Sequence, residues 1–206
     1  MEQIETEYKW AVRKRSDFKK LKNILAERGW ACAFSAPVLL DTYFDAPGGA
    51  LSAEKSALRL RKTVLNGKTF YELTLKSASE VINGLARRKE ITVPLNAPDR
   101  REALTKFRKE AAKLNQKAVS LCRLFSILNR RKTFLINAPE FKAELSFDNC
   151  LIKSGTHKKL LESELEFKGG KISAFNAFAA YLGRESGLKA PIKSKVATAR
   201  ALRAGE

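Results

Sequence analysis

The chain has 206 residues, of which 44% are hydrophobic and 30% charged, and its formal net charge is +18. A chain of this length can bury a substantial core, so we expect one domain spanning residues 1–206. The positive charge favours an anionic partner without choosing between nucleic acid and a smaller phosphate compound. No apolar run approaches the roughly 20 residues that cross a bilayer, so we expect no membrane partner and a cytoplasmic protein.

Three cysteines, Cys32, Cys122 and Cys150, are too few and too scattered for a disulfide framework, and none has the spacing of a metal ligand. We expect all three to be buried thiols in a reducing compartment. The single histidine, His157, lies in a polar stretch. A nucleophile system of the Ser/His/Asp or Cys/His kind therefore has no basis in this sequence.

In chain order, the first half predicts strands with one helix between them. Residues 4–10 alternate as a strand does, and Ser16-Asp17 is an N-cap signal for a helix that ends at Gly29. A strand over 37–45 leads through a turn at 46–49 into a helical turn at 50–55. Strands at 57–61 and 71–76 form a hairpin around Asn66-Gly67, and a further strand covers 86–95.

In the second half, Pro98-Asp99 opens a basic stretch that we expect to be helical over 99–123. Strands at 122–137 and 140–153 are joined by a turn at 137–139. A strand at 162–168 and a helix from about 173 to 182 complete the predicted elements, and a lysine-containing tail follows.

Six of these strands carry charged side chains on one face and apolar side chains on the other. Carboxylates gather in the first and last strands, and cations in the middle ones. A solvated sheet face explains any single strand of this kind, but like charges two residues apart are unfavourable without a ligand. The carboxylates are Glu5, Glu7, Glu144, Asp148, Glu162, Glu164 and Glu166, and the cations of the middle strands are Arg59, Arg61, Lys76, Arg88 and Lys89.

Clustered carboxylates favour a divalent cation, and clustered arginines and lysines favour a polyanion. If the polar face of the sheet curls inward, both ligands would meet in one cavity, and helices would cover the apolar face from outside. The pattern therefore predicts a charged interior, with an ordinary half-solvated sheet as the alternative.

These motifs, in this order, resemble those of the CYTH superfamily, the triphosphate tunnel metalloenzymes. The similarity covers essentially the whole chain, and the bacterial inorganic triphosphatase branch is the most similar. Members of that branch often carry a second, histidine-rich helical domain that this sequence lacks, so we expect a self-contained activity. The residues that carry the resemblance are Glu5-Thr6-Glu7-Tyr8-Lys9, which fits the ExExK signature, then the segments 41–45, 57–61, 72–76, 87–90, Glu144 with Asp148, and 162–166.

The resemblance implies an α+β fold, an eight-stranded antiparallel β-barrel that forms a tunnel open at both ends and is surrounded by helices. It also implies site roles. Arg130 and Arg131 have opposite strand parity, so only one can face the tunnel, and the sequence leaves open which. The implied metal ligands are Glu5, Glu7, Glu144, Asp148, Glu164 and Glu166; the implied substrate-binding residues are Lys9, Arg59, Arg61, Lys76, Arg88, Arg130, Arg131 and Lys195; and the implied catalytic residues are Lys9, Lys76, Arg88 and Glu90.

Ligands that are all carboxylates suit Mg²⁺ or Mn²⁺ rather than zinc. We therefore expect a metal-dependent triphosphatase that hydrolyses inorganic triphosphate (tripolyphosphate) to diphosphate and phosphate. The general base stays open among Glu90, a metal-ligating carboxylate and a lysine of lowered pKa.

The alternatives within the superfamily are an adenylate cyclase and a thiamine or nucleoside triphosphatase. Outside it, the alternative is a non-enzymatic module that binds polyphosphate or nucleic acid. Nucleic acid is not specifically expected, since solvated helix faces explain much of the charge excess. The expected partner is a small molecule that contains a triphosphate, and the protein is expected to be a monomer or a homodimer.

Overall fold

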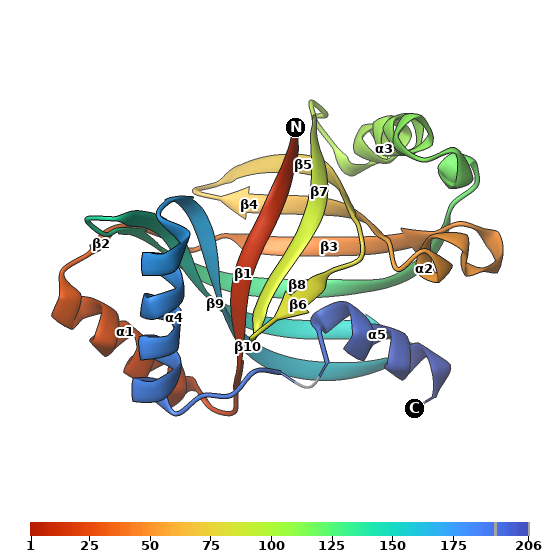
Figure 1. The fold of residues 1–206 in the computed structure, drawn as a ribbon. Helices are drawn as coiled ribbons and strands as arrows, with labels where there is room; N and C mark the ends of the chain where they lie inside the picture. The colour runs from red at the N-terminus through yellow and green to blue at the C-terminus, as the bar shows by residue number, and fades with distance from the viewer. Residues whose placement is uncertain (192, 206) are drawn as a thin grey trace.

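Ten strands form one antiparallel sheet in the computed structural model, which describes residues 1–191 and 193–205 and, for Cys32, the backbone only (Figure 1). Eight of them close into a barrel in the order β1-β10-β9-β8-β3-β4-β5-β7, and β7 returns to β1. The two extra strands, β2 and β6, pair with β8 and β7. The strands are β1 (Glu2–Val12), β2 (Ala31–Ser35), β3 (Val38–Asp45), β4 (Ala57–Leu65), β5 (Lys68–Lys76), β6 (Glu80–Ile82), β7 (Leu85–Leu95), β8 (Cys122–Asn137), β9 (Phe141–Ser154) and β10 (Thr156–Gly170).

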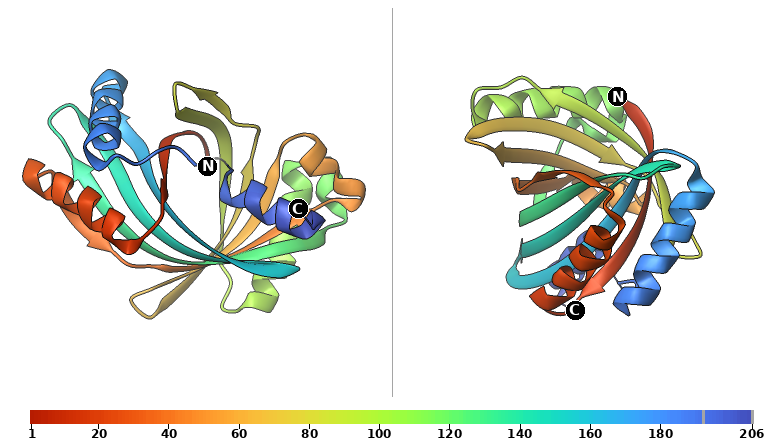
Figure 2. Two further views of the ribbon diagram at one scale, coloured as in Figure 1. Left: turned by 90° about the horizontal axis from the view of Figure 1, so that it is seen from below. Right: turned by 90° about the vertical axis from the view of Figure 1, so that its left-hand side faces the viewer.

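Five α-helices surround the barrel within the described residues (Figures 1 and 2). They are α1 (Arg15–Arg28), α2 (Ala50–Ala53), α3 (Arg100–Leu114), α4 (Ile172–Ser186) and α5 (Lys195–Ala204), with short 3-10 helices η1 (Pro47–Gly49) and η2 (Gln116–Val119). The predicted α+β barrel with helices outside it is therefore confirmed.

The barrel closes through its first strand, which pairs with two others. Glu2 to Glu7 pair with β7, and Glu7 to Val12 pair with β10. Closure thus places strands from the start, middle and end of the chain next to one another. Because alternate side chains point inward, this pairing also brings the acidic face of β1 against the basic face of β7.

Two apolar clusters hold helices against the outside of the barrel. One joins α1 and α4 to β1, β9 and β10, where Trp10, Leu145 and Leu165 pack against Phe175 and other helix residues. The other joins α3 to β4, β5 and β7 through Phe107. The apolar strand residues of these two clusters thus face outward toward the helices, away from the charged barrel interior.

The last helix, α5, is placed differently from the others. Its Ala199 is fully buried in a third cluster with Tyr43, Phe125, Ile127 and Ile152, and Tyr43 and Ile127 also line the interior cavity. α5 therefore packs against inward-facing residues of β3 and β8, and the tunnel open at both ends that the resemblance implied stays a prediction.

The structure corrects the expected helix over 99–123. α3 ends at Leu114, because Asn115 is in the extended conformation at φ −150°, and η2 then leads into β8. The elements β2 and β6 were not predicted, while the predicted β8 boundaries agree with the structure. The resemblance implied a closing helix at Lys195, and α5 begins at this residue.

The cysteines follow the prediction only in part. Cys150 is buried, Cys122 is exposed, and the side chain of Cys32 lies outside the described residues. Among the described residues, no helix combines the length and the apolar character that a membrane crossing requires.

Candidate functional site

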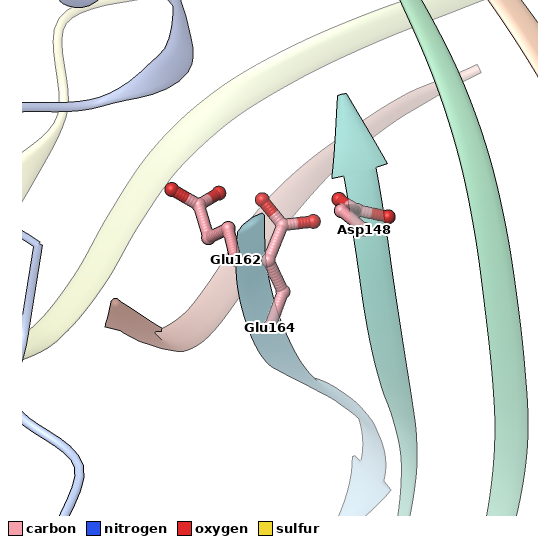
Figure 3. A group of neighbouring side chains, drawn as sticks. All are labelled: Asp148, Glu162 and Glu164. Atoms are coloured by element: carbon pink, nitrogen blue, oxygen red, sulfur yellow. The ribbon is translucent and has the colours of Figure 1, made fainter. Parts of the chain in front are cut away.

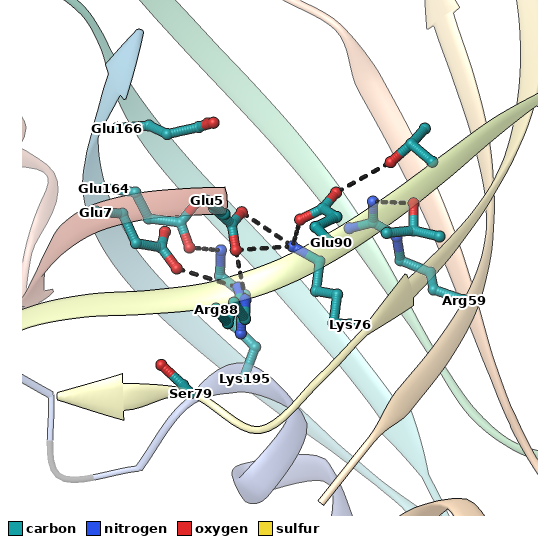
Figure 4. Close-up of polar contacts among 12 residues, drawn as sticks. Glu5, Glu7, Arg59, Lys76, Ser79, Arg88, Glu90, Glu164, Glu166 and Lys195 are labelled. Carbon is teal, nitrogen blue, oxygen red and sulfur yellow. Dashed lines mark hydrogen bonds and ion pairs between the residues drawn. The ribbon is translucent and has the colours of Figure 1, made fainter. Parts of the chain in front are cut away.

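The barrel interior contains a cavity of about 610 Å³ whose walls are mostly charged side chains (Figure 4). They come from β1, β3, β4, β5, β7, β8, β9, β10 and α5. The wall carries both acidic and basic groups. The charged residues that line it are Glu5, Lys9, Asp41, Lys55, Arg59, Arg61, Glu72, Lys76, Arg88, Glu90, Arg131, Glu144, Glu164, Glu166, Lys168, Lys195 and Arg200.

Pairing of β1 with β7 brings Glu5 and Glu7 to Arg88. Arg88 donates hydrogen bonds from Nε to Glu5 and from a terminal nitrogen to Glu7 at 3.1 Å. Burial would raise the pKa of Glu5, but Lys76 and Arg88 together hold it well below its usual value. Glu5 is therefore held ionised by these two cations.

Lys76 links this group to β7. Its Nζ lies 3.0 Å from Glu5 and 2.8 Å from Glu90. Burial, with Arg88 and Arg59 nearby, lowers the pKa of Lys76 despite these two carboxylates. Repulsion between neighbouring cations is thus present at Lys76, which makes its amine easier to deprotonate than a solvated lysine.

Arg59 and Arg61 share a carboxylate that the sequence analysis did not assign to the site. Arg61 donates two hydrogen bonds to Asp41, at 2.6 and 2.8 Å, and Arg59 lies 3.7 Å from it. Arg59 also contacts Glu72 at 3.3 Å. Asp41 is part of the family motif at 41–45, and its position two residues before Tyr43, on the same inward face of β3, was the signal that could have identified it.

The geometry of β8 shows which of Arg130 and Arg131 faces the barrel interior. Arg131 lines the cavity and contacts Asp148 and Glu164, each at 2.6 Å. Arg130 is exposed on the outer face of the same strand. Arg131 is therefore the inward residue, as expected for side chains of opposite parity.

Three carboxylates, from Asp148, Glu162 and Glu164, form the tightest acidic group in the described chain, with ligand oxygens within 4.8 Å of one another (Figure 3). Asp148 has no exposed surface and Glu162 only 1%. Burial raises the pKa of Glu162 to about 7. The sequence analysis counted Glu162 among the clustered acids but left it out of the implied ligands.

Cations surround this acidic group. Nζ of Lys195 contacts all three carboxylates, at 2.9 Å from Glu164, at 3.1 Å from Glu162, and in a short hydrogen bond to Asp148. Lys9 lies 2.8 Å from Glu164. Burial would raise the pKa of Glu164, but Lys195 and Lys9 hold it well below its usual range.

The residues present fit a divalent cation. Both oxygens of Glu162 are buried, and the one ion-pair contact they have among the described residues is with Lys195. Three converging carboxylates offer the hard oxygen ligands that Mg²⁺ and Mn²⁺ prefer. Lys195 fills the space between them as a monovalent cation. A divalent ion would satisfy the buried oxygens of Glu162 more fully.

The other implied metal ligands lie elsewhere on the wall. Glu144 is 4.0 Å from Arg131, and Glu166 is 2.6 Å from Lys168. Burial raises the pKa of Glu166. Within the described residues, these two and the Glu5/Glu7 pair are not part of the three-carboxylate group, although Glu166 is opposite both Glu7 and Glu144 in the sheet.

A closed β-barrel with buried carboxylates beside arginines and lysines defines a class of proteins with a charged tunnel. The chain matches the CYTH domain over residues 3–199, and it belongs to this family. The resemblance that the motifs carried is thereby confirmed at the level of the family, and the particular likeness to bacterial inorganic triphosphatases stays a prediction.

Solved structures share this fold at low sequence identity. The protein PH1819 from Pyrococcus horikoshii OT3 superposes with a TM-score of 0.68 at 18% identity, over 97% of this chain and 99% of that one. HpAC1 from Hippeastrum, an adenylyl cyclase candidate described as having a dominant triphosphatase activity, gives 0.66 at 17% identity, over 97% and 96%. The Mimivirus capping enzyme triphosphatase gives 0.56 at 10% identity, over 89% of each chain.

Proposed function

We propose that this protein hydrolyses inorganic triphosphate to diphosphate and phosphate, with Mg²⁺ or Mn²⁺, as a single cytoplasmic CYTH domain of residues 1–206. The observation that carries the proposal is the buried group of Asp148, Glu162 and Glu164 directly beside the cationic wall of one cavity. A pure anion binder gains nothing from carboxylates next to its cations. The triphosphatase descriptions of two proteins with this fold support the same class of reaction.

Phosphate binding falls to the cations of β4, β5, β7 and β8. Arg59, Arg61 and Arg131 present guanidinium groups that can hold phosphate oxygens in pairs, and Lys76 and Arg88 lie on neighbouring strands. Each of them contacts a carboxylate in the described state. A triphosphate would compete with those carboxylates for the same donors, so binding should exchange one set of ion pairs for another.

Asp148, Glu162 and Glu164 would bind the metal ion, and the ammonium of Lys195 would move away from them when it binds. When bound, the metal would neutralise phosphate charge and make a bound water a better nucleophile. The implied ligands Glu5, Glu144 and Glu166 stay part of the proposal as groups that line the same wall. Glu7 stays part of it as the second carboxylate that Arg88 contacts.

In the reaction, a water oxygen attacks the terminal phosphorus, the bond from that phosphorus to the bridging oxygen breaks, and diphosphate leaves. We propose that Glu90 is the general base, which accepts a proton from the attacking water. This carboxylate lines the cavity, and its buried Oε2 lies 2.8 Å from the Lys76 ammonium. Lys76 can give one of its own protons to the leaving oxygen, since its pKa is lowered, and then take up the water proton from Glu90.

The test is phosphate release from tripolyphosphate, ATP and thiamine triphosphate, each with Mg²⁺, with Mn²⁺ and with excess chelator. We expect tripolyphosphate to be the preferred substrate and chelation to abolish turnover. Glu90→Gln should lower turnover by about 10²-fold or more, while Glu80→Gln, an exposed carboxylate on β6, should not. Full activity in excess chelator would contradict the metal mechanism, and conversion of ATP to cyclic AMP would assign a cyclase instead.

A further inference from the structure

A second cavity, of about 620 Å³, lies on the outside of the barrel, between α1 and the outer faces of β2, β8 and β9. Figure 1 shows α1 and β2 at the same end of the molecule. We call this cavity the outer groove. Its lining residues are Arg15, Phe18, Lys19, Lys22, Phe34, Arg130, Lys132, Phe134, Phe147 and Asn149.

Four phenylalanine rings in contact form the floor of the outer groove. Phe18 stacks on Phe147 with centroids 5.0 Å apart, Phe147 contacts Phe134 at 5.6 Å, and Phe134 contacts Phe34 at 5.1 Å. The series runs from a buried ring to an exposed one, since Phe147 is 5% exposed and Phe34 57%. The groove thus ends in an aromatic surface that is open to a ligand.

All charged residues that line the outer groove are basic. Five cations line it and no carboxylate does. Among the described residues, none of the five has an ion-pair partner within 4.0 Å, whereas Lys106 and Lys113 on α3 pair with acidic residues of their own helix. Neighbouring cations without counter-ions attract an anion with repeated charges.

We propose that the outer groove binds single-stranded nucleic acid, with unpaired bases stacked on Phe34 and Phe134 and phosphates held by the surrounding lysines and arginines. Aromatic faces stack on any unpaired base, and cations along a groove follow the backbone. The bases of a duplex are already stacked on one another and would leave the rings unused. An acidic peptide would use the cations but has no general need for the rings.

This binding site goes beyond the proposed hydrolysis and is independent of it. Arg130 and Lys132 point into the outer groove, while Arg131, between them on β8, points into the barrel. One strand therefore separates the two cavities. Nucleic acid was not specifically expected because solvated helix faces explain much of the charge excess, and β2, which was not predicted, supplies the exposed ring that changes this interpretation.

The test is fluorescence anisotropy with a 3′-labelled oligouridine that has a 5′-hydroxyl, so that it offers no triphosphate to the barrel. Phe34→Ala should weaken binding at least about fivefold, the lower end of measured base-stacking effects. Its matched control is Phe70→Ala, an equally exposed ring (53%) on β5, which should leave binding unchanged. Circular dichroism and melting temperatures verify that both variants fold.

A second pair of variants distinguishes binding in the outer groove from attraction by the net charge of the protein. Arg130→Gln with Lys132→Gln should lower the slope of log affinity against log salt by about 1.4, at about 0.7 for each phosphate contact. Arg108→Gln with Lys109→Gln removes an equal number of positive charges from the exposed face of α3. This double variant should lower the salt-dependence slope by much less. Duplex of matched length should bind more weakly than the single strand and be insensitive to Phe34→Ala.

Three results would overturn the proposal. The first is equal loss of binding in the two double variants, which would mean attraction by net charge only. The second is unchanged oligouridine binding in Phe34→Ala. The third is binding to vesicles of anionic lipid that depends on Phe34 while oligouridine binding does not, which would assign the groove to a membrane surface.

Discussion

Lys195, the first residue of α5, donates a hydrogen bond to the carboxylate of Asp148, which lies on β9 with no exposed surface. The same ammonium contacts Glu162 and Glu164. Burial would lower the pKa of Lys195, but these carboxylates raise it well above its usual value. The position of α5 is therefore linked to the charge of the acidic group, as well as to the apolar contacts of Ala199.

Replacing Lys195 should expose this link. In metal-free buffer, Lys195→Ala leaves three buried carboxylates with fewer cations, and we expect a loss of about 2 kcal/mol, less than for a pair with no other partner because Arg131 and Lys9 remain. That corresponds to a melting temperature lower by about 4–8 °C. Mn²⁺ should raise the melting temperature of the variant more than that of the parent, because no ammonium competes for the carboxylates.

The control for this variant is Lys193→Ala, an exposed lysine of the same tail. It should melt like the parent with and without Mn²⁺. If Lys195→Ala also melts like the parent, or if Mn²⁺ stabilises both proteins equally, then Lys195 does not occupy the metal position.

The stability of the metal-free protein should depend on pH through Glu162. The native state keeps its proton up to a pKa of about 7, while the unfolded chain loses it near the usual 4.5. The native state therefore binds more protons between these values, and this group lowers the free energy of unfolding as pH rises through that window. Glu162→Gln should remove the decrease, so its stability relative to the parent should rise between about pH 4.5 and 7, by at most about 3 kcal/mol.

Denaturant unfolding at several pH values with chelator present measures this difference. Glu27→Gln, at an exposed position of α1, should differ from the parent by a constant amount at all pH values. A flat difference for Glu162→Gln would show that Glu162 ionises normally in the folded protein.

Loss of one carboxylate of the acidic group should affect turnover before stability. Glu164→Gln keeps the side-chain shape but removes a charge that contacts Arg131, Lys9 and Lys195. We expect turnover of tripolyphosphate to fall by at least about 10²-fold, since a lost metal ligand removes several kcal/mol of transition-state stabilisation. The metal concentration for half-maximal rate should rise. Glu2→Gln, exposed on β1, is the control, and near-normal activity of Glu164→Gln at all metal concentrations would remove Glu164 from the site.

Triphosphate should stabilise the folded protein when a poorly catalytic metal such as Ca²⁺ is used. Binding to the native state alone adds about 2.7 kcal/mol at a hundredfold excess over Kd, which raises the melting temperature by several degrees. Arg59→Gln with Arg61→Gln should remove most of this shift. Arg108→Gln with Lys109→Gln on α3 should keep it, and the opposite pattern would place the anion site on the outer surface.

The fold could be predicted from the sequence wherever strand alternation was strong. The boundaries of β8 followed from local pattern. α1 begins at Arg15, close to the predicted Ser16-Asp17 signal, but its N-cap is Lys14 and Asp17 lies within the first turn. β2 and β6 were missed because they are five and three residues long and pair only at the margin of the barrel. The extent of the 99–123 helix was wrong because basic composition continues past Asn115 while the backbone does not.

The site was predictable as a set of residues but not as a set of pairs. Parity placed Glu5, Arg59 and Lys76 on inward faces. Strand order is a tertiary property, however, and it alone brings Glu5 to Arg88 and Asp41 to Arg61. Along the sequence, carboxylates and cations gather in different strands, as expected. Closure of the barrel brings these acidic and basic strands next to one another.

The double pairing of β1 has a consequence for how the polypeptide reaches its native state. Residues 7–12 find their partners on β10, at positions 161–166, about 150 residues further along the chain. At about 5–20 residues per second, a ribosome adds that length in roughly 8–30 s. During synthesis the strand that carries Glu5, Glu7 and Lys9 must therefore wait with one edge unpaired, and barrel closure, being non-local, should be among the slow steps of folding. The first strand to be made is thus among the last to be enclosed.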